Sequence, residues 1–114
     1  MSSQRDTRPG LSDLERTLLL ALLHCGGTAH GSLLQTAIEE RTGRRLSPGA
    51  LYTALARMEE KGLVRSWKGE PTPERGGRRK RHYEVEAVGE AALARHLDEL
   101  RRLTTGLPPR FRLS

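Results

Sequence analysis

The residues SPGALYTALARMEEKG at positions 47–62 strongly constrain the fold, because they define both ends and the buried side of one helix. Ser47 followed by Pro48 is typical of a helix N-terminus, where serine caps the helix and proline occupies the first turn. Gly62 predicts its end. The apolar residues between them follow helical spacing and form one stripe: Ala50, Leu51, Ala54, Leu55 and Met58. A strand pattern starts at once after Gly62, so a helix is predicted to lead directly into a strand.

Two further helices are predicted upstream. Ser12 and Glu15 form a capping-box pattern, and the leucine-rich residues after them predict a first helix that is apolar on nearly all sides. GGTAHG interrupts this pattern at residues 26–31. SLLQTAIEERTG then predicts a second helix, with Ser32 as its cap and Gly43 as its stop.

Two strands and a last helix are predicted downstream. LVRSWKG and HYEVEA, at residues 63–69 and 82–87, are separated by a loop too long and too rich in glycine and proline for a tight turn. Leu63 and Trp67 favour one buried face of the first strand and Val64 favours the other, so that choice stays open. A helix is predicted from about Gly89, and the prolines after Thr105 exclude helix in the tail.

This order of elements predicts a mainly α fold with a small β-hairpin, that is, a winged helix-turn-helix followed by a C-terminal helix. A chain of 114 residues has room for one domain. We expect a flexible N-terminal segment over residues 1–10, the winged helix-turn-helix over 11–88, the C-terminal helix over 89–105 and a tail over 106–114.

Positive charge is concentrated between the two predicted strands. Of a formal net charge of +6, +5 falls between Arg65 and His82, which predicts a polyanionic partner. In a winged helix this hairpin is the wing, and its basic side chains neutralise phosphates of double-stranded DNA. Gly76 and Gly77 let the backbone approach the duplex. The predicted wing contacts are Arg75, Gly77, Arg78, Arg79, Lys80 and Arg81.

The third helix is expected to read DNA bases, with its N-terminal turn in the major groove. Several of its polar and aromatic side chains fall outside the buried stripe and are therefore free for contact. The predicted contacts on this helix are Ser47, Pro48, Gly49, Tyr52, Thr53 and Arg57.

LSPGALYTALARMEEKGLVRSW, GRRKRHYEV and GEAAL together resemble the PadR family of bacterial transcriptional regulators, over roughly Gly31 to Leu93. The resemblance implies a winged-helix homodimer that binds a palindromic promoter site, usually as a repressor. It also implies DNA contacts at Ser47, Tyr52 and the wing cluster Arg78–Arg81. With a single helix after the wing, the chain is similar to the short branch of the family.

The C-terminal helix is the predicted dimerisation element, with help from the first helix. Its leucines recur at a spacing close to a heptad seam, and the first helix has more leucines than one core-facing stripe requires. The predicted interface residues are Leu14, Leu18, Leu22, Leu93, Leu97 and Leu100. A small-molecule effector is expected at this interface. Drug sensors of the short branch offer a tryptophan on the C-terminal helix, whereas Trp67 here lies on a wing strand and gives drug sensing no support.

Other chemistries have little support in the sequence. Cys25 is the only cysteine, which excludes an intrachain disulfide, favours a reducing compartment and fits a small buried hydrophobe better than a redox sensor. His24, Cys25 and His30 lack convincing metal-ligand spacing. No enzyme signature is present, so we expect no catalytic residue, metal or cofactor. No apolar run is long enough to cross a bilayer, and a cytoplasmic location without membrane contact is expected.

Two alternatives to specific DNA binding remain open. A winged helix can serve as a protein–protein interaction module, although such modules rarely need a hairpin with a charge of +5. RNA could bind the same basic face, but stacking aromatic residues for single strands are scarce, with only Tyr52 and Tyr83 near it.

Overall fold

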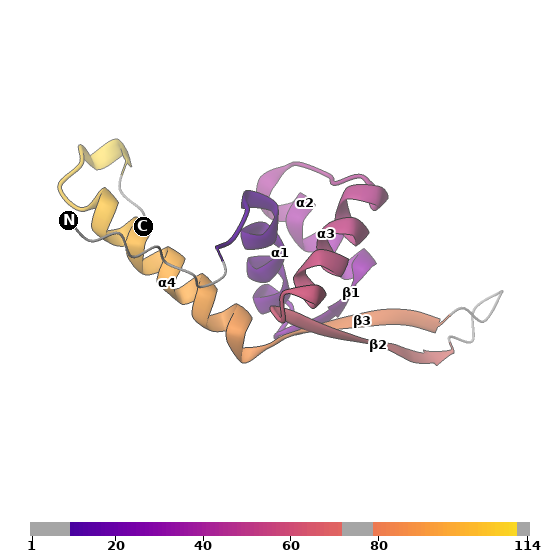
Figure 1. The fold of residues 1–114 in the computed structure, drawn as a ribbon. Helices are drawn as coiled ribbons and strands as arrows, with labels where there is room; N and C mark the ends of the chain where they lie inside the picture. Colours follow the sequence, from indigo (N-terminus) through magenta and orange to yellow (C-terminus); the bar gives the residue numbers. More distant parts are fainter. Residues whose placement is uncertain (1–9, 72–78, 112–114) are drawn as a thin grey trace.

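The computed structural model describes residues 10–71 and 79–111. The elements in chain order are α1 (Asp13–His24), β1 (Thr28–His30), α2 (Gly31–Thr42), α3 (Pro48–Glu60), β2 (Val64–Pro71), β3 (Arg79–Val85), α4 (Ala87–Thr104) and the 3-10 helix η1 (Pro109–Phe111). Helices α1, α2 and α3 pack together, the β2–β3 hairpin extends to one side of them, and α4 extends to the other (Figure 1). This mainly α arrangement confirms the winged helix-turn-helix predicted from the sequence.

The capping box predicted at the start of α1 is present. The Glu15 amide donates to Ser12 Oγ at 3.2 Å, and the Ser12 amide donates to Glu15 Oε1 at 2.9 Å. Glu15 is only 4% exposed, and Lys61 Nζ donates to its Oε2 at 2.7 Å. Burial opposes the charged carboxylate, but the hydrogen bonds from Lys61 and Ser12 outweigh it, so the pKa of Glu15 lies below its ordinary value. This ion pair joins the start of α1 to the end of α3.

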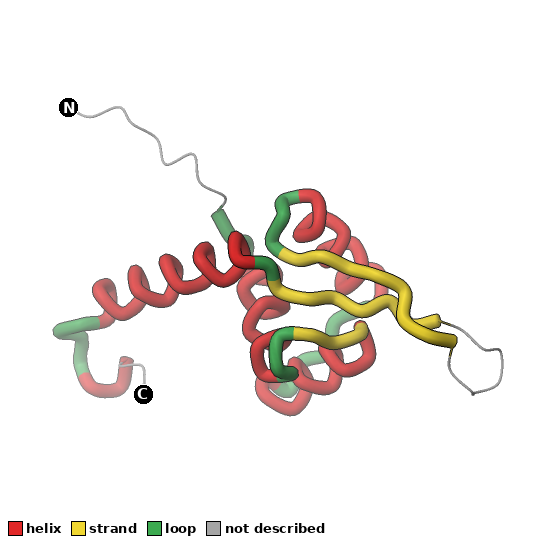
Figure 2. The backbone as a smooth tube through the Cα atoms, turned by 90° about the horizontal axis from the view of Figure 1, so that it is seen from below, coloured by secondary structure: helices red, strands yellow, loops and turns green. Residues whose placement is uncertain are grey.

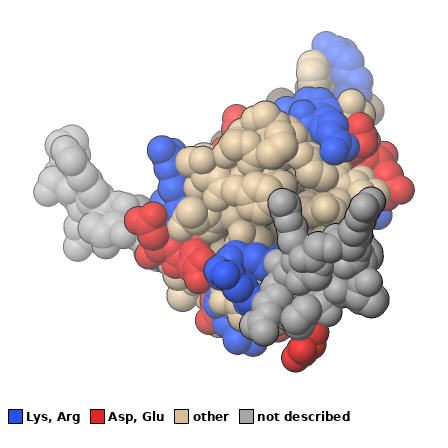
Figure 3. Space-filling model, turned by 90° about the vertical axis from the view of Figure 1, so that its right-hand side faces the viewer, with Lys and Arg blue, Asp and Glu red and all other residues tan. Residues whose placement is uncertain are grey.

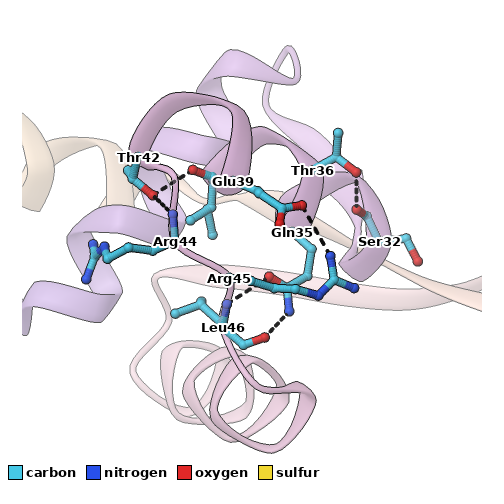
Figure 4. A network of polar contacts seen from close by, with 9 residues as sticks. Ser32, Gln35, Thr36, Glu39, Thr42, Arg44, Arg45 and Leu46 are labelled. Carbon is cyan, nitrogen blue, oxygen red and sulfur yellow. Dashed lines mark hydrogen bonds and ion pairs between the residues drawn. The ribbon is translucent and has the colours of Figure 1, made fainter.

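Helices α2 and α3 form the helix-turn-helix. Gly43 ends α2 in the left-handed conformation, and the Ser47 side chain accepts from the Ala50 amide at 3.1 Å to cap α3, as the sequence predicts. Gln35 holds the turn between them: its side-chain amide donates to the Leu46 carbonyl and accepts from the Leu46 amide (Figure 4). The start of α2 was predicted wrongly, since the helix begins at Gly31 and Ser32 lies inside it.

The sheet has three strands instead of the two predicted. Thr28, Ala29 and His30 form β1, which pairs with β3 antiparallel, so that the order across the sheet is β1–β3–β2 (Figure 2). Both Leu63 and Val64 are buried, whereas Trp67 is 36% exposed. The buried face of β2 is therefore the one that Val64 favours, and Leu63 enters the core just before the strand begins.

The hydrophobic core lies between the three helices and the inner face of the sheet. Its fully buried large side chains are Leu18, Leu19, Leu22, Leu34, Leu51, Leu55, Met58, Leu63 and Val64. Tyr83 of β3 closes the core from the sheet side, and burial raises the pKa of its hydroxyl. Leu93 of α4 is 2% exposed and joins the same core.

Helix α4 contacts the rest of the chain through its first turns. A Cβ added at Gly89 would lie 2.3 Å from the Leu63 carbonyl oxygen, so only glycine allows this close approach. Ala92 and Leu93 are buried there, and the helix then leads away from the body (Figure 1). Prolines at 108 and 109 do exclude α-helix in the tail, but one turn of 3-10 helix forms at Pro109–Phe111.

Burial divides the residues of the predicted dimer interface into two groups. Leu18, Leu22 and Leu93 fill the core of the single chain and are at most 2% exposed. Leu14 is half-buried, Leu97 is 37% exposed and Leu100 is half-buried. Packing within the chain accounts for most leucines of α1, because α2, α3, the sheet and α4 all pack against that helix, whereas Leu20 and Leu23 are exposed. In the described part of the chain, no helix is long and apolar enough to cross a membrane.

Candidate nucleic-acid interface

The exposed side of α3 is divided into two flanks and a central strip. Leu51, Ala54, Leu55 and Met58 bury the opposite side. Tyr52 lies on the flank next to α2, while Thr53 and Arg57 lie on the flank next to α1. The strip between the flanks carries Gly49 and Ala56, which are small and exposed. Small side chains in this position let a helix approach a groove closely.

Tyr52 packs against the first residue of α2. A Cβ built on Gly31 would meet the Tyr52 hydroxyl oxygen at 2.3 Å, so the ring lies directly over this glycine. Next to the ring is a hollow of about 300 Å³. It is lined by Gly31, Ser32, Gln35, Thr36, Arg45, Pro48, Leu51 and Tyr52. Tyr52 is 47% exposed, so its ring is at once part of this hollow and open to solvent.

Thr53 and Arg57 line a second hollow, of about 390 Å³, together with the N-terminal turn of α1. Ser12, Leu14 and Glu15 form the α1 wall, and Lys61 closes one end. Both predicted contact residues are exposed. They therefore lie on the same helix as Tyr52 but not on the same side of it, a difference that the sequence pattern alone did not reveal.

The two ends of α3 differ in charge. Its N-terminal turn has no acidic residue, whereas its last turn carries Glu59 and Glu60 together with Arg57. Ser66 of β2 donates to Glu59 Oε1 at 2.7 Å, and Arg81 of β3 donates to Ser66 Oγ at 3.0 Å. Carboxylates repel phosphate, so the N-terminal half of α3 is the half suited to a polyanion.

Strand alternation divides the basic residues of the hairpin between its two faces. Arg81 lies on the face toward the helices, next to Ser66, whereas Lys80 lies on the outer face with His82. Both are exposed. The predicted contacts Arg75, Gly77 and Arg78, and the side chain of Arg79, lie outside the described residues. Figure 3 views the side toward which the hairpin points, where Lys and Arg form separate patches around a mainly uncharged surface.

Two arginines in the turn of the helix-turn-helix were missed by the sequence-based prediction. Arg44 and Arg45 are exposed, and Arg45 lines the hollow beside Tyr52. Arg45 also pairs with Glu39 at 3.3 Å (Figure 4), an exposed contact that contributes little stability. The signal was present in the sequence, because both arginines directly precede the capped start of the predicted reading helix.

The described residues give no support to metal chemistry. Among residues 10–71 and 79–111, no group of three or more histidine, cysteine or acidic side chains could hold a metal ion. Cys25 is a half-buried free thiol at the end of α1. It packs against the core, in keeping with the role of a small hydrophobe.

A three-helix body with a β-hairpin wing defines the winged-helix class of DNA-binding proteins, and solved structures confirm this fold. F93 from STIV, a winged-helix DNA-binding protein, aligns with a TM-score of 0.68 over 86% of this chain and 98% of its own, at 13% identity. A PadR family transcription regulator from Clostridium difficile R20291 aligns with a TM-score of 0.68 over 82% and 92%, at 24% identity. RosR of H. salinarum aligns with a TM-score of 0.67 over 92% and 86%, at 21% identity.

Within this class, the chain belongs to the transcriptional regulator PadR-like family, whose model matches residues 19–95. This family and fold are those of transcription regulators, not of enzymes. The chain is also 39% identical over 93 residues to an uncharacterised 37.1 kDa protein in transposon Tn4556 of Streptomyces fradiae. The match covers 82% of this chain but only 24% of that protein, so the chain spans about a quarter of that relative's length.

Proposed function

We propose that the protein is a homodimeric repressor that binds a palindromic operator in double-stranded DNA, at its own or a neighbouring promoter. The observation that carries this proposal is the exposed side of α3, where the small residues Gly49 and Ala56 lie on a strip between Tyr52 and Thr53, beside a basic hairpin. A helix with this surface fits a major groove, and the hairpin supplies phosphate contacts.

The charge distribution supports a division of work between the two elements. The hairpin and its loop account for most of the net charge of the chain, and phosphate contact by such residues gives affinity without reading sequence. Thr53 and Arg57 are suited to base edges, and Tyr52 to a phosphate through its hydroxyl. Binding to double-stranded DNA is therefore favoured over RNA, whose deep, narrow major groove excludes a helix.

The end of α4 supports dimerisation. Beyond Leu93 this helix extends from the body, and it carries the exposed apolar residues Leu97 and Leu103. Leu107 and Phe111 add further exposed apolar surface just after it. An isolated amphipathic helix is marginal in water, so a second copy of α4 is the proposed partner of this surface. Two copies related by a two-fold axis place two α3 helices on a palindrome.

An effector is proposed to bind where α1 and α4 of the dimer meet. Leu20 and Leu23 of α1 and Leu97 and Leu103 of α4 are exposed apolar side chains, and a dimer that brings these helices together would give an effector an apolar site. A ligand there would change the angle between the two copies and thereby the fit of both reading helices. Ligand-induced NMR shifts confined to the wing would contradict this location.

Selection of duplexes from a random pool by the purified protein tests the proposal. We expect enrichment of one palindromic sequence, protected over two half-sites in footprinting, and a dimer in light scattering. A promoter fusion carrying that sequence should give lower expression in cells that contain the protein. Binding to no duplex at low salt would exclude the proposal and favour the alternative, a protein–protein interaction module.

A further inference from the structure

Two of the four histidines of the chain lie side by side on the outer face of the sheet. His30 of β1 and His82 of β3 are paired across the two strands, and their ring centroids are 5.9 Å apart in an edge-to-face arrangement. Both side chains are half-buried, so each ring keeps an accessible edge. Neither residue belongs to the predicted DNA contacts of α3 or of the wing.

The surroundings of the pair favour an anion. The rings of Trp67 and His82 are stacked with their centroids 5.8 Å apart, and the Arg65 guanidinium lies over the same indole ring at 4.9 Å. Lys80 lies on the same face of β3, two residues before His82. Glu84 of β3 lies on this face too, and its carboxylate pairs with Arg65 and accepts from Thr28. Helix α2, which begins next to His30, has no acidic residue in its first turn.

The pair also lies between the two parts of the proposed DNA interface. His30 directly precedes Gly31, over which the Tyr52 ring is packed. His82 directly follows Lys80 and Arg81 of the wing. The pair therefore lies between the start of α2, on which Tyr52 packs, and the base of the basic hairpin.

Burial, followed by the charges of Lys80 and the nearby His82, lowers the pKa of His30 in the free protein below its ordinary value. A phosphate oxygen next to the rings has the opposite effect, because an anion stabilises the imidazolium form. A phosphate bound at this point would therefore make the free and DNA-bound protein differ in how many protons they hold.

We propose that His30, His82 and Lys80 form a phosphate contact between the reading helix and the wing, at which DNA binding takes up a proton on the histidine pair. This inference rests on the proposed function, since the phosphate belongs to bound DNA. Gly69 positions the site from β2: a Cβ there would lie 2.5 Å from His82 Nε2 and displace the ring.

The sign of the pH dependence follows from linkage. Above the pKa of the DNA-bound pair neither state holds the extra proton, and below the pKa of the free pair both do. Between these limits affinity rises as pH falls, by up to about tenfold per pH unit for each proton taken up. The window lies in the histidine range, between about pH 5 and 8.

The test measures affinity for a fluorescein-labelled, mixed-sequence duplex three helical turns long, at constant salt across this pH range. The variants are His30→Gln, His82→Gln, their double variant and Lys80→Ala, with His24→Gln on α1 as the matched control. We expect the wild type and the control to share one slope, the double variant to lose it, and Lys80→Ala to bind more weakly at every pH with the slope retained. Circular dichroism checks that each variant is folded.

Calorimetry of the wild type gives a second measurement that needs no substitution. Binding enthalpies in buffers with different ionisation enthalpies report the protons taken up directly, and about one per protein chain is expected at neutral pH. A slope that survives in the double variant, a slope that disappears equally in the control, or no proton uptake would each overturn the inference. In those cases DNA binding itself stays intact, whereas a wild type that binds no duplex at any pH would remove the proposed function with it.

Discussion

Lys61 is the residue that lets a carboxylate stay charged inside this small protein. Its ammonium contacts Glu15, whose own amide and side chain cap α1 through Ser12. One ion pair thus stabilises the start of α1, the end of α3 and the contact between them. The pair lies beside Thr53 and Arg57, so a loss of packing here would also move the proposed reading helix.

Replacing Lys61 with Met should lower the free energy of unfolding by about 1–3 kcal/mol at neutral pH, because a buried acceptor loses its charged donor. The pKa of Glu15 is lowered in the folded state, so its contribution is fully present above the unfolded-state pKa and lost as pH falls through the folded-state pKa. Urea unfolding over a pH series measures this. Lys68→Met, at an exposed lysine on β2, is the matched control and should change stability little at any pH.

Two glycines in helices should respond oppositely to alanine. Gly89→Ala places a methyl group against the Leu63 carbonyl and should cost about 1–3 kcal/mol in thermal unfolding. Gly49→Ala meets nothing within 4 Å and should stabilise α3 by up to about 1 kcal/mol. If Gly49 approaches DNA as proposed, the same stable variant should bind its operator more weakly. A Gly49→Ala protein with unchanged operator affinity would contradict that contact.

At the scale of elements, α4 is divided into a buried start and an exposed end. Leu93 belongs to the core of its own chain, so the proposed dimer seam begins only at Leu97. This division allows dimerisation to be disturbed without unfolding the body, which would not be so if the whole leucine row were interfacial.

A Leu97→Lys, Leu100→Lys double variant should be a folded monomer. Two charges buried in the seam cost several kcal/mol of association, while the single chain loses only about 1 kcal/mol because both side chains are partly exposed there. Light scattering gives the mass and circular dichroism the helix content. Glu99→Lys adds the same charge on the same helix and should remain a dimer. A stable dimer of the double variant would place the interface elsewhere.

The wing and the reading helix should give different kinds of mutant. Replacing Arg78, Arg79 and Arg81 with Ala should weaken binding to operator and scrambled duplex alike. The slope of log affinity against log salt concentration should become shallower by up to about one unit for each phosphate that is no longer neutralised. Replacing Thr53 and Arg57 should lower operator affinity by about 1–3 kcal/mol per base contact, with less effect on scrambled DNA. Both sets are measured on both duplexes across a salt series, and equal effects would contradict this division.

At the scale of the molecule, the features predicted from the sequence are those set by neighbouring residues. Ser12 with Glu15, Ser47 with Pro48, and Gly43 each define a helix end through contacts a few residues away. Strand β1 escaped prediction because its three residues show no period, and its partner Glu84 is 56 positions from Thr28. The same holds for the site, since the basic wing could be read locally but the pairing of His30 with His82 required the sheet.

The attachment of α4 at one end gives the molecule the geometry of a lever. Gly89, Ala92 and Leu93 form the pivot against the body, and the helix continues to Thr104. The helix runs for 11 residues beyond Leu93, a length of about 16 Å, so turning it by about 10° at the pivot displaces its far end by about 3 Å. In the proposed two-fold dimer the far ends would be joined, and that displacement would change the distance between the two reading helices. The two half-sites of an operator are separated by a fixed number of helical turns of DNA. A small rotation of α4 at the pivot would therefore change the spacing of the two α3 helices enough to prevent both from fitting their half-sites.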